Sequence, residues 1–251
     1  MRRCRQKLPK LASETESPFS LLALRALAFV VACLGLVWAV PNLAASAVSD
    51  DFRDLDARLL QFDVLKPSSA IRILRDAESN TLSVCDTHAQ RALLLMEMPL
   101  AEIALRSGGA KDFDLHLNTI ESRSKQVLGC TPRDSLVWLL LFGIEIEHGN
   151  LGSHAFDLLE MSYETSPNEG WIGVRRTVVA VPVLLAAPEP VQQMILSEFE
   201  RLVRNRMVEN PARAYSTASA PVRALLQSRI DKLDAKSRKL FSDTLAGFDR
   251  L

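Results

Sequence analysis

Several residue types and patterns are scarce in this chain, and each scarcity excludes a class of structure. Glycine occurs 10 times and proline 12 times in 251 residues, which excludes a collagen-like chain. Long runs that alternate apolar and polar residues are absent, as are the Asn-Gly and Asp-Gly pairs that mark β-hairpins. The 30 basic and 30 acidic side chains cancel, which argues against a nucleic-acid partner. We therefore expect a folded, all-α protein.

Signatures of catalysis and metal binding are also missing. The sequence contains no G-x-S-x-G, H-E-x-x-H or phosphate-binding loop, and no C-x-x-C accompanies its four cysteines. Of the four histidines, His148 and His154 are closest in sequence, but a predicted turn separates them. The favoured role of His148 is to interact with the negative end of a helix dipole. We expect no metal, no cofactor and no enzymatic activity.

The amino-terminal segment combines clustered positive charge with a long uncharged stretch. Five of the first ten residues are basic, and no charge occurs from residue 26 to residue 48. About 20 apolar residues span a bilayer, and preceding basic residues stay in the cytoplasm. The pattern predicts a cytoplasmic tail over 1–20, a single-pass signal anchor in the bacterial inner membrane over 21–48, and a periplasmic domain over 49–251. Cleavage after Ala47 is the alternative, because Ala45-Ser46-Ala47 has the form that signal peptidase accepts.

Two of the four cysteines, Cys85 and Cys130, belong to the predicted exported domain. An even number of cysteines in an oxidising compartment predicts one disulfide bond. It would close a loop of about 45 residues and contribute about 3–4 kcal/mol. Two separate buried thiols are the alternative.

Helix-boundary signals recur through residues 49–251. Ser166-Pro167 and Thr131-Pro132 have the form of capping boxes at helix starts. Gly108 and Gly149 mark helix ends, and Asp234 can cap the last helix. Proline is expected to kink or divide two helices, at Pro99 and Pro182. Short links favour antiparallel neighbours, and 207–221 is predicted to be the loosest stretch. The predicted helices are 50–62, 69–78, 86–107, 112–128, 134–148, 153–164, 168–186, 189–206, 221–233 and 235–248.

Residues 136–169 resemble a tetratricopeptide repeat, in which a 34-residue helical hairpin packs small residues where its helices cross. Prolines 132 and 167, and glycines 108 and 143, are each 35 residues apart. The upstream copy keeps little else of the pattern, and the downstream copy fails at Pro190. The resemblance implies a degenerate array of antiparallel α-hairpins. The matching positions are Leu139, Phe142, Gly143, Ile146, Ala155, Leu159, Ser162 and Pro167.

The whole chain also resembles small signal-anchored helical proteins associated with bacterial envelope or exopolysaccharide assembly. The basic start, the span, Cys85, the segment from Cys130 to Trp138 and the segment from Glu169 to Arg176 carry this resemblance, and no active-site motif accompanies it. It implies a tethered adaptor that recruits a protein partner. The alternative is a polysaccharide-binding or polysaccharide-modifying protein that uses tryptophans and arginines. The candidate interaction residues are Trp138, Trp171, Arg175, Arg176, Arg201 and Arg204.

Overall fold

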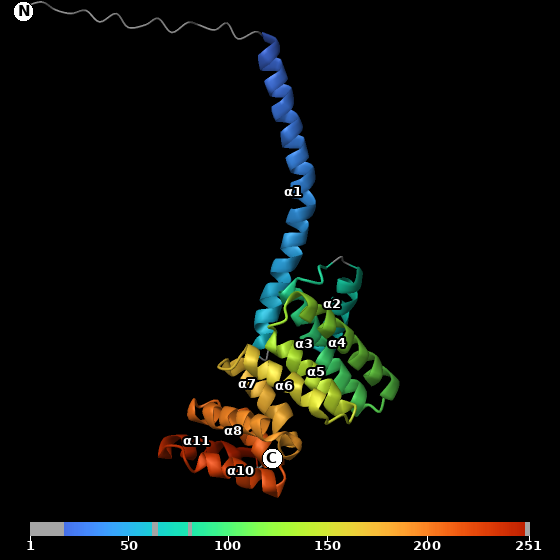
Figure 1. Ribbon diagram of the computed structural model, residues 1–251. Coiled ribbons are helices and arrows are strands. Elements are labelled where there is room, and N and C mark those ends of the chain that lie inside the picture. Colours follow the sequence, from blue (N-terminus) through green and yellow to red (C-terminus); the bar gives the residue numbers. More distant parts are fainter. Residues whose placement is uncertain (1–17, 62–64, 80–81, 249–251) are drawn as a thin grey trace, which may run out of the picture. The chain divides into compact units, whose positions relative to one another are not determined.

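The computed structural model in Figure 1 describes residues 18–61, 65–79 and 82–248. Every regular element in these ranges is a helix, which confirms the all-α prediction. The chain forms two compact units, residues 1–48 and residues 49–251, which are described separately.

The first unit contains most of α1, which begins at Pro18 and continues to Leu60. Its window from Leu22 to Ala39 has a mean hydropathy of 2.2 and no buried side chain. Trp38, for example, is 72% exposed. An exposed apolar helix of this length is consistent with a signal anchor or a signal peptide. Most of the predicted tail over 1–20, and the side chains of 45–47 at the predicted cleavage site, lie outside the described residues.

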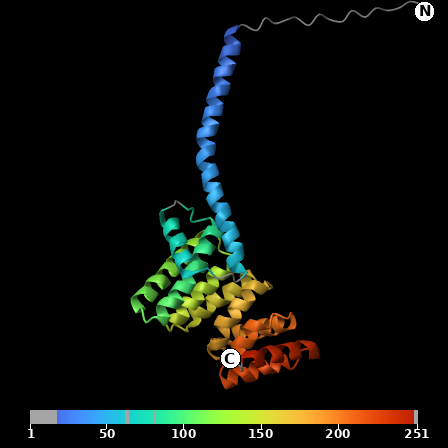
Figure 2. The same cartoon turned by 180° about the vertical axis from the view of Figure 1, so that it is seen from behind.

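The second unit begins with the last turns of α1 and continues, in its described part, through ten α-helices and one 3-10 helix (Figures 1 and 2). The elements in chain order are α2 (Pro67–Ser79), α3 (Thr87–Arg106), α4 (Ala110–Cys130), α5 (Ser135–Glu147), α6 (Ser153–Thr165), α7 (Gly170–Ala180), η1 (Val181–Ala186), α8 (Glu189–Arg204), α9 (Glu209–Thr217), α10 (Ala220–Ile230) and α11 (Ala235–Phe248).

Neighbouring helices pack as antiparallel pairs, most extensively α3 with α4 and α5 with α6, and less extensively α4 with α5 and α7 with α8. Large apolar side chains fill the interior of these pairs: Leu93 on α3, Phe142 on α5 and Phe199 on α8 are at most 1% exposed. Burial of a Leu or Phe side chain stabilises a fold by about 1.5–3 kcal/mol, so this interior holds the pairs together. The predicted array of α-hairpins is confirmed.

Both predicted capping boxes are wrong. Thr131 follows the end of α4, and α5 is capped instead by Asp134, whose carboxylate accepts two backbone N–H groups of the first turn at 3.1 and 3.3 Å. Ser166 follows the end of α6, and α7 begins only at Gly170. In each case the proline after Thr131 or Ser166 lies in the turn between two helices, because proline cannot continue the preceding helix.

Other boundary signals are confirmed. Gly108 and Gly149 have φ angles of 76° and 75° and end α3 and α5, since glycine adopts this left-handed conformation without steric cost. Asp234 caps α11 by accepting two backbone N–H groups, each at 3.0 Å. After α8 the same left-handed position is occupied by Arg206, at a φ of 65°.

The prolines and the predicted loose stretch give mixed outcomes. Pro182 interrupts a helix as predicted, since α7 stops at Ala180 and the 3-10 helix follows. Pro99 does not divide α3, whose buried apolar face continues on both sides of it. The expectation for 207–221 is wrong because α9 lies there, with Pro211 in its first turn, where helical N–H groups have no partner in any case.

Candidate functional site

The predicted disulfide between Cys85 and Cys130 is present, with an S–S distance of 2.01 Å. It joins the turn before α3 to the last residue of α4, and therefore ties the two ends of one helical pair. The alternative of two separate thiols is wrong. Thiols in the cytoplasm are kept reduced, so a disulfide indicates that this domain lies outside the cytoplasm.

The two candidate tryptophans, Trp138 and Trp171, lie near the starts of α5 and α7 and are half-buried. The indole N–H of Trp138 donates to the carbonyl oxygen of Pro132 at 2.8 Å. The indole N–H of Trp171 donates to the Glu169 carboxylate at 2.5 Å, and the Arg175 guanidinium lies 5.8 Å from its ring. Both tryptophans therefore fix local structure at helix starts.

Arg176 is fully buried and takes no part in a surface, which corrects its assignment as an interaction residue. Its guanidinium donates to the Glu198 carboxylate at 2.6 Å and to the carbonyl oxygens of Ser162 and Ser166 at 2.7 and 3.0 Å. It therefore joins α7 and α8 to the end of α6. The sequence around Arg176 does not reveal this, because the partner Glu198 lies 22 residues away.

Close packing surrounds this buried ion pair. A side-chain carbon at Gly173 would lie 2.9 Å from the Glu198 carboxylate, so the absence of a side chain there makes room for the pair. The Arg176 guanidinium also stacks 4.5 Å from the ring of Tyr163. Burial raises the pKa of the Tyr163 hydroxyl well above its usual value.

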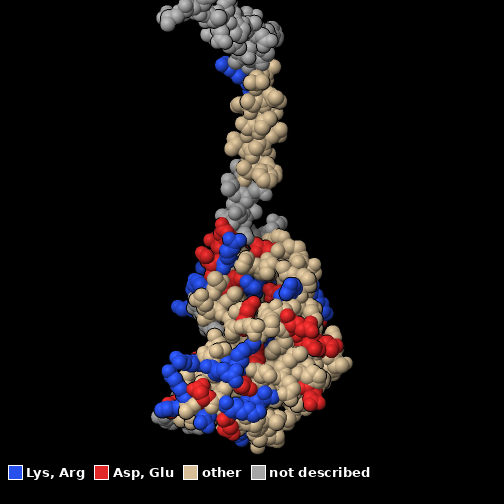
Figure 3. Space-filling model, turned by 60° about the vertical axis from the view of Figure 1, so that its left-hand side comes forward, with Lys and Arg blue, Asp and Glu red and all other residues tan. Residues whose placement is uncertain are grey.

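The other candidate arginines, Arg175, Arg201 and Arg204, are already engaged. Arg175 donates to two carbonyl oxygens in the last turn of α1, and burial lowers its pKa. Arg201 donates to Asn168 at 2.6 Å and lies 3.2 Å from the Glu198 carboxylate, whereas Arg204 pairs with a glutamate one turn earlier. Figure 3 shows basic and acidic side chains interspersed over one face of the domain. Arg201 and Arg204 line one cavity, but Glu164, Glu198 and Glu200 line it too, so the candidate arginines do not form a basic groove.

A second buried ionic cluster, which was not predicted from the sequence, is centred on Asp56 in the last turns of α1. The Asp56 carboxylate is 1% exposed and accepts two hydrogen bonds from Arg91, at 2.8 and 2.5 Å. It also lies 2.9 Å from His88, and Arg91 lies 3.6 Å from Asp134. Burial raises the pKa of Asp134, although the charge of Arg91 opposes this. The spacing of Asp56 between the buried Phe52 and Leu59 is the only sequence signal for this cluster.

An apolar groove of about 590 Å³ is the second feature that the sequence analysis missed. It is lined mainly by α3, α4, α5 and α7, and three large apolar side chains along it remain exposed: Met98 by 38%, Leu105 by 53% and Val178 by 43%. Three positions of the repeat-like pattern, Leu139, Gly143 and Ile146, also line the groove. Gly143 and Ile146 are half-exposed, whereas Leu139 and the other apolar positions of the pattern on α5 and α6 are buried.

Within the described residues, no three His, Cys, Asp or Glu side chains lie together in an arrangement that could hold a metal ion. Comparisons of the chain with protein-family models, with curated proteins and with solved structures found no match.

Proposed function

We propose that the chain is a membrane-tethered scaffold in the bacterial envelope, whose periplasmic domain holds an amphipathic helix of a partner protein in the apolar groove. The apolar α1 window and the disulfide support a tethered domain outside the cytoplasm. The mechanism is recruitment, without catalysis. The observation that carries the proposal is the groove itself.

The groove has the chemistry of a helix-binding site. Helices bind such grooves through apolar side chains spaced three or four residues apart on one face. Met98, Leu105 and Val178 offer apolar contacts that are open to solvent in the unbound chain. Monomeric proteins seldom leave large apolar side chains clustered in this way without an interaction partner.

Charge at the groove selects the kind of helix. The carboxylates of Glu102 and Glu147 border it near the ends of α3 and α5, and Glu102 also pairs with Arg106. Arg175 lines the groove as well, but its guanidinium donates to carbonyl oxygens at the end of α1. Complementary charges at an interface favour the correct partner and its correct orientation. The proposed partner helix therefore carries lysine or arginine beside its apolar face. The resemblance to envelope and exopolysaccharide assembly proteins directs the search for it to those systems.

The polysaccharide-binding alternative has less support. It relied on exposed Trp138 and Trp171 and on a basic groove. Both rings are half-buried with their N–H groups bonded, and the arginines are paired with acidic or carbonyl oxygens.

Photocrosslinking in the native membrane tests the proposal. A benzophenone amino acid is placed at Val178 in the groove and, as a control, at Leu115, which is 62% exposed but does not line the groove. We expect one protein adduct from Val178 and none from Leu115. The crosslinked peptide should be an amphipathic helix with basic residues, and Glu147→Lys should weaken the adduct unless a basic residue of that helix is changed to glutamate.

Equal labelling from both positions, or an adduct that is indifferent to Glu147→Lys, would contradict the proposal. An adduct with glycan alone would favour the polysaccharide alternative.

A further inference from the structure

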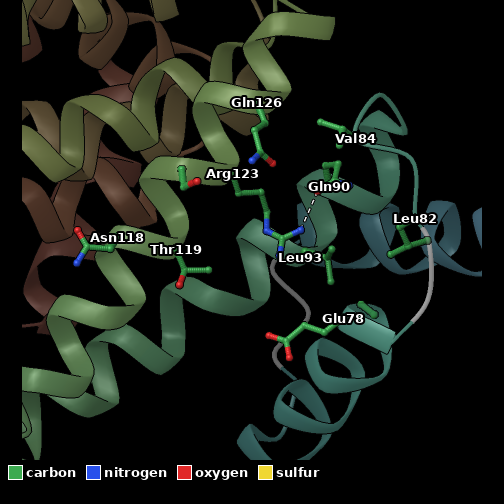
Figure 4. A pocket seen from close by; sticks show the side chains of 11 residues that line it. Glu78, Leu82, Val84, Gln90, Leu93, Asn118, Thr119, Arg123 and Gln126 are labelled. Carbon is green, nitrogen blue, oxygen red and sulfur yellow. Dashed lines mark hydrogen bonds between the residues drawn. The ribbon is translucent and has the colours of Figure 1, made fainter.

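A second cavity, of about 470 Å³, lies among α2, the turn before α3, and the helices α3 and α4. It shares no lining residue with the apolar groove, and its lining is mostly polar. Its volume is within the range of about 300–1,000 Å³ that is typical of small-molecule sites. Figure 4 shows its side chains reaching inward from both sides.

Two opposite charges enter this cavity from different helices. Arg123 extends from α4 and Glu78 from α2 (Figure 4). The Arg123 guanidinium donates to the neutral Gln90 side chain at 2.8 Å. Burial lowers the pKa of Arg123 even though Glu97 and Glu78 counteract it. A guanidinium that lies in a cavity and donates to a neutral amide favours an anionic ligand group beside it.

Hydrogen bonds and the disulfide hold the part of the cavity wall that is formed by the turn before α3 and by α3 itself. The Gln90 carboxamide donates to the carbonyl oxygen of Ser83 at 2.9 Å, and this bond holds its oxygen toward Arg123. The disulfide lies directly after Val84 and ties this turn to the end of α4. A preorganised site loses less entropy on binding.

The remaining lining distinguishes between ligand classes. The side chains of Thr119, Ser122 and Gln126 supply hydroxyl and amide groups, which can donate to and accept from a peptide bond. The apolar part consists of the aliphatic side chains of Ala77, Leu82, Val84 and Leu93, and among the described residues that line the cavity none has an aromatic ring that would stack on a sugar.

We propose that this cavity binds a short peptide with free termini, whose carboxylate pairs with Arg123 and whose ammonium group pairs with Glu78. Arginine is suited to the carboxylate because its planar fork donates two parallel hydrogen bonds. The amide and hydroxyl groups of α4 bind the peptide bond between the termini. This inference does not depend on the proposed groove function, because the two sites share no residue.

Calorimetric titration of the full-length protein in a nonionic detergent tests the proposal, with L-alanyl-L-alanine as the probe. We expect the free dipeptide to bind about ten-fold or more tightly than its N-acetyl form and than its carboxamide form, because each lacks one charge-assisted contact. D-glucuronate, which has a carboxylate and hydroxyls but no ammonium group, should bind more weakly than the dipeptide.

Variants assign each terminus to its partner. In Glu78→Gln the dipeptide and its N-acetyl form should bind equally, and in Arg123→Gln the dipeptide and its carboxamide should bind equally. Arg123→Lys keeps the charge but loses the fork, and it should retain intermediate affinity if Arg123→Gln does not fold. Arg106→Gln, which changes an exposed arginine on α3 that does not line the cavity, should leave every affinity unchanged.

The proposal is overturned if the unmodified protein does not bind the dipeptide. It is also overturned if D-glucuronate binds more tightly, or if both variants weaken all probes by the same factor.

Discussion

Replacing Glu198 with leucine is expected to destabilise the domain much more than replacing Glu198 and Arg176 together with apolar residues. The single substitution leaves a guanidinium that is 0% exposed without its carboxylate partner. The double substitution Glu198→Leu with Arg176→Met removes both charges from the interior. The two variants therefore separate the cost of a stranded charge from the cost of altered packing.

The magnitude follows from the contacts of Arg176. Loss of one partner from a buried ion pair costs about 3–5 kcal/mol, whereas replacing both partners with apolar side chains is often close to neutral. The double variant also removes Arg176 from the carbonyl oxygens of Ser162 and Ser166, which accept from it at 2.7 and 3.0 Å. The Ser162 oxygen still accepts from the Thr165 hydroxyl at 3.4 Å, so the unsatisfied acceptor is that of Ser166. One such acceptor costs about 1–3 kcal/mol against about 3–5 kcal/mol for the stranded guanidinium, so we expect the double variant to recover about 2 kcal/mol relative to Glu198→Leu.

Thermal unfolding of the full chain in a nonionic detergent, followed by far-UV circular dichroism, measures the difference. For a domain of this size 1 kcal/mol corresponds to about 2–4 °C, so Glu198→Leu should lower Tm by about 10 °C. Glu121→Leu, which removes a partly exposed partner of Lys125, should cost less than about 1 kcal/mol and serves as the control. A double variant as unstable as Glu198→Leu would refute the reasoning, because packing would then dominate over charge.

Three further predictions concern single contacts. Substitution of both Cys85 and Cys130 with serine should lower the free energy of unfolding in urea by about 3–4 kcal/mol, since the bond closes 45 residues; an unchanged midpoint would contradict this. Burial raises the pKa of Tyr163 in the folded protein above its unfolded value of 10. The stability that comes from keeping the hydroxyl protonated is complete below pH 10 and is lost as pH rises through the folded pKa. Alkaline unfolding should therefore be less steep in Tyr163→Phe when dichroism is followed from pH 9 to 12, and an unchanged slope would exclude this role. Arg206→Gly should raise Tm, because a residue with a side chain costs about 1–2 kcal/mol in the left-handed backbone conformation that Arg206 adopts. A lower Tm would show that contacts of the arginine side chain stabilise the domain by more than this strain costs.

The features that were predictable from the sequence are those set by local chemistry. Gly108 and Gly149 end helices because the left-handed conformation is a property of single residues. The pairing of Cys85 with Cys130 followed from export, which leaves these two cysteines in the domain. Successive short links made antiparallel pairs the expected packing.

The features that were not predictable depend on which face of a helix is turned inward. Arg175 and Arg176 are adjacent in sequence, yet the first reaches carbonyl oxygens at the end of α1 and the second is fully buried against α8. In the sequence, Asp56 has the pattern of a carboxylate on a helix surface, because its partner Arg91 lies 35 residues later in the chain. The groove around Val178 likewise arises only when several helices are assembled.

The last turns of α1 have a consequence for how the domain unfolds. A stack of hairpins that touch only their neighbours can open one unit at a time, because its stability is a sum of local terms. Here Asp56 bonds to α3, while the carbonyl oxygens of Leu59 and Leu60 accept from Arg175 on α7, 115 residues further along the chain. The last turns of α1 therefore bind both α3 and α7. Because these contacts link the first and the last of the intervening hairpins, we expect the helices from α3 to α7 to unfold together as one cooperative unit.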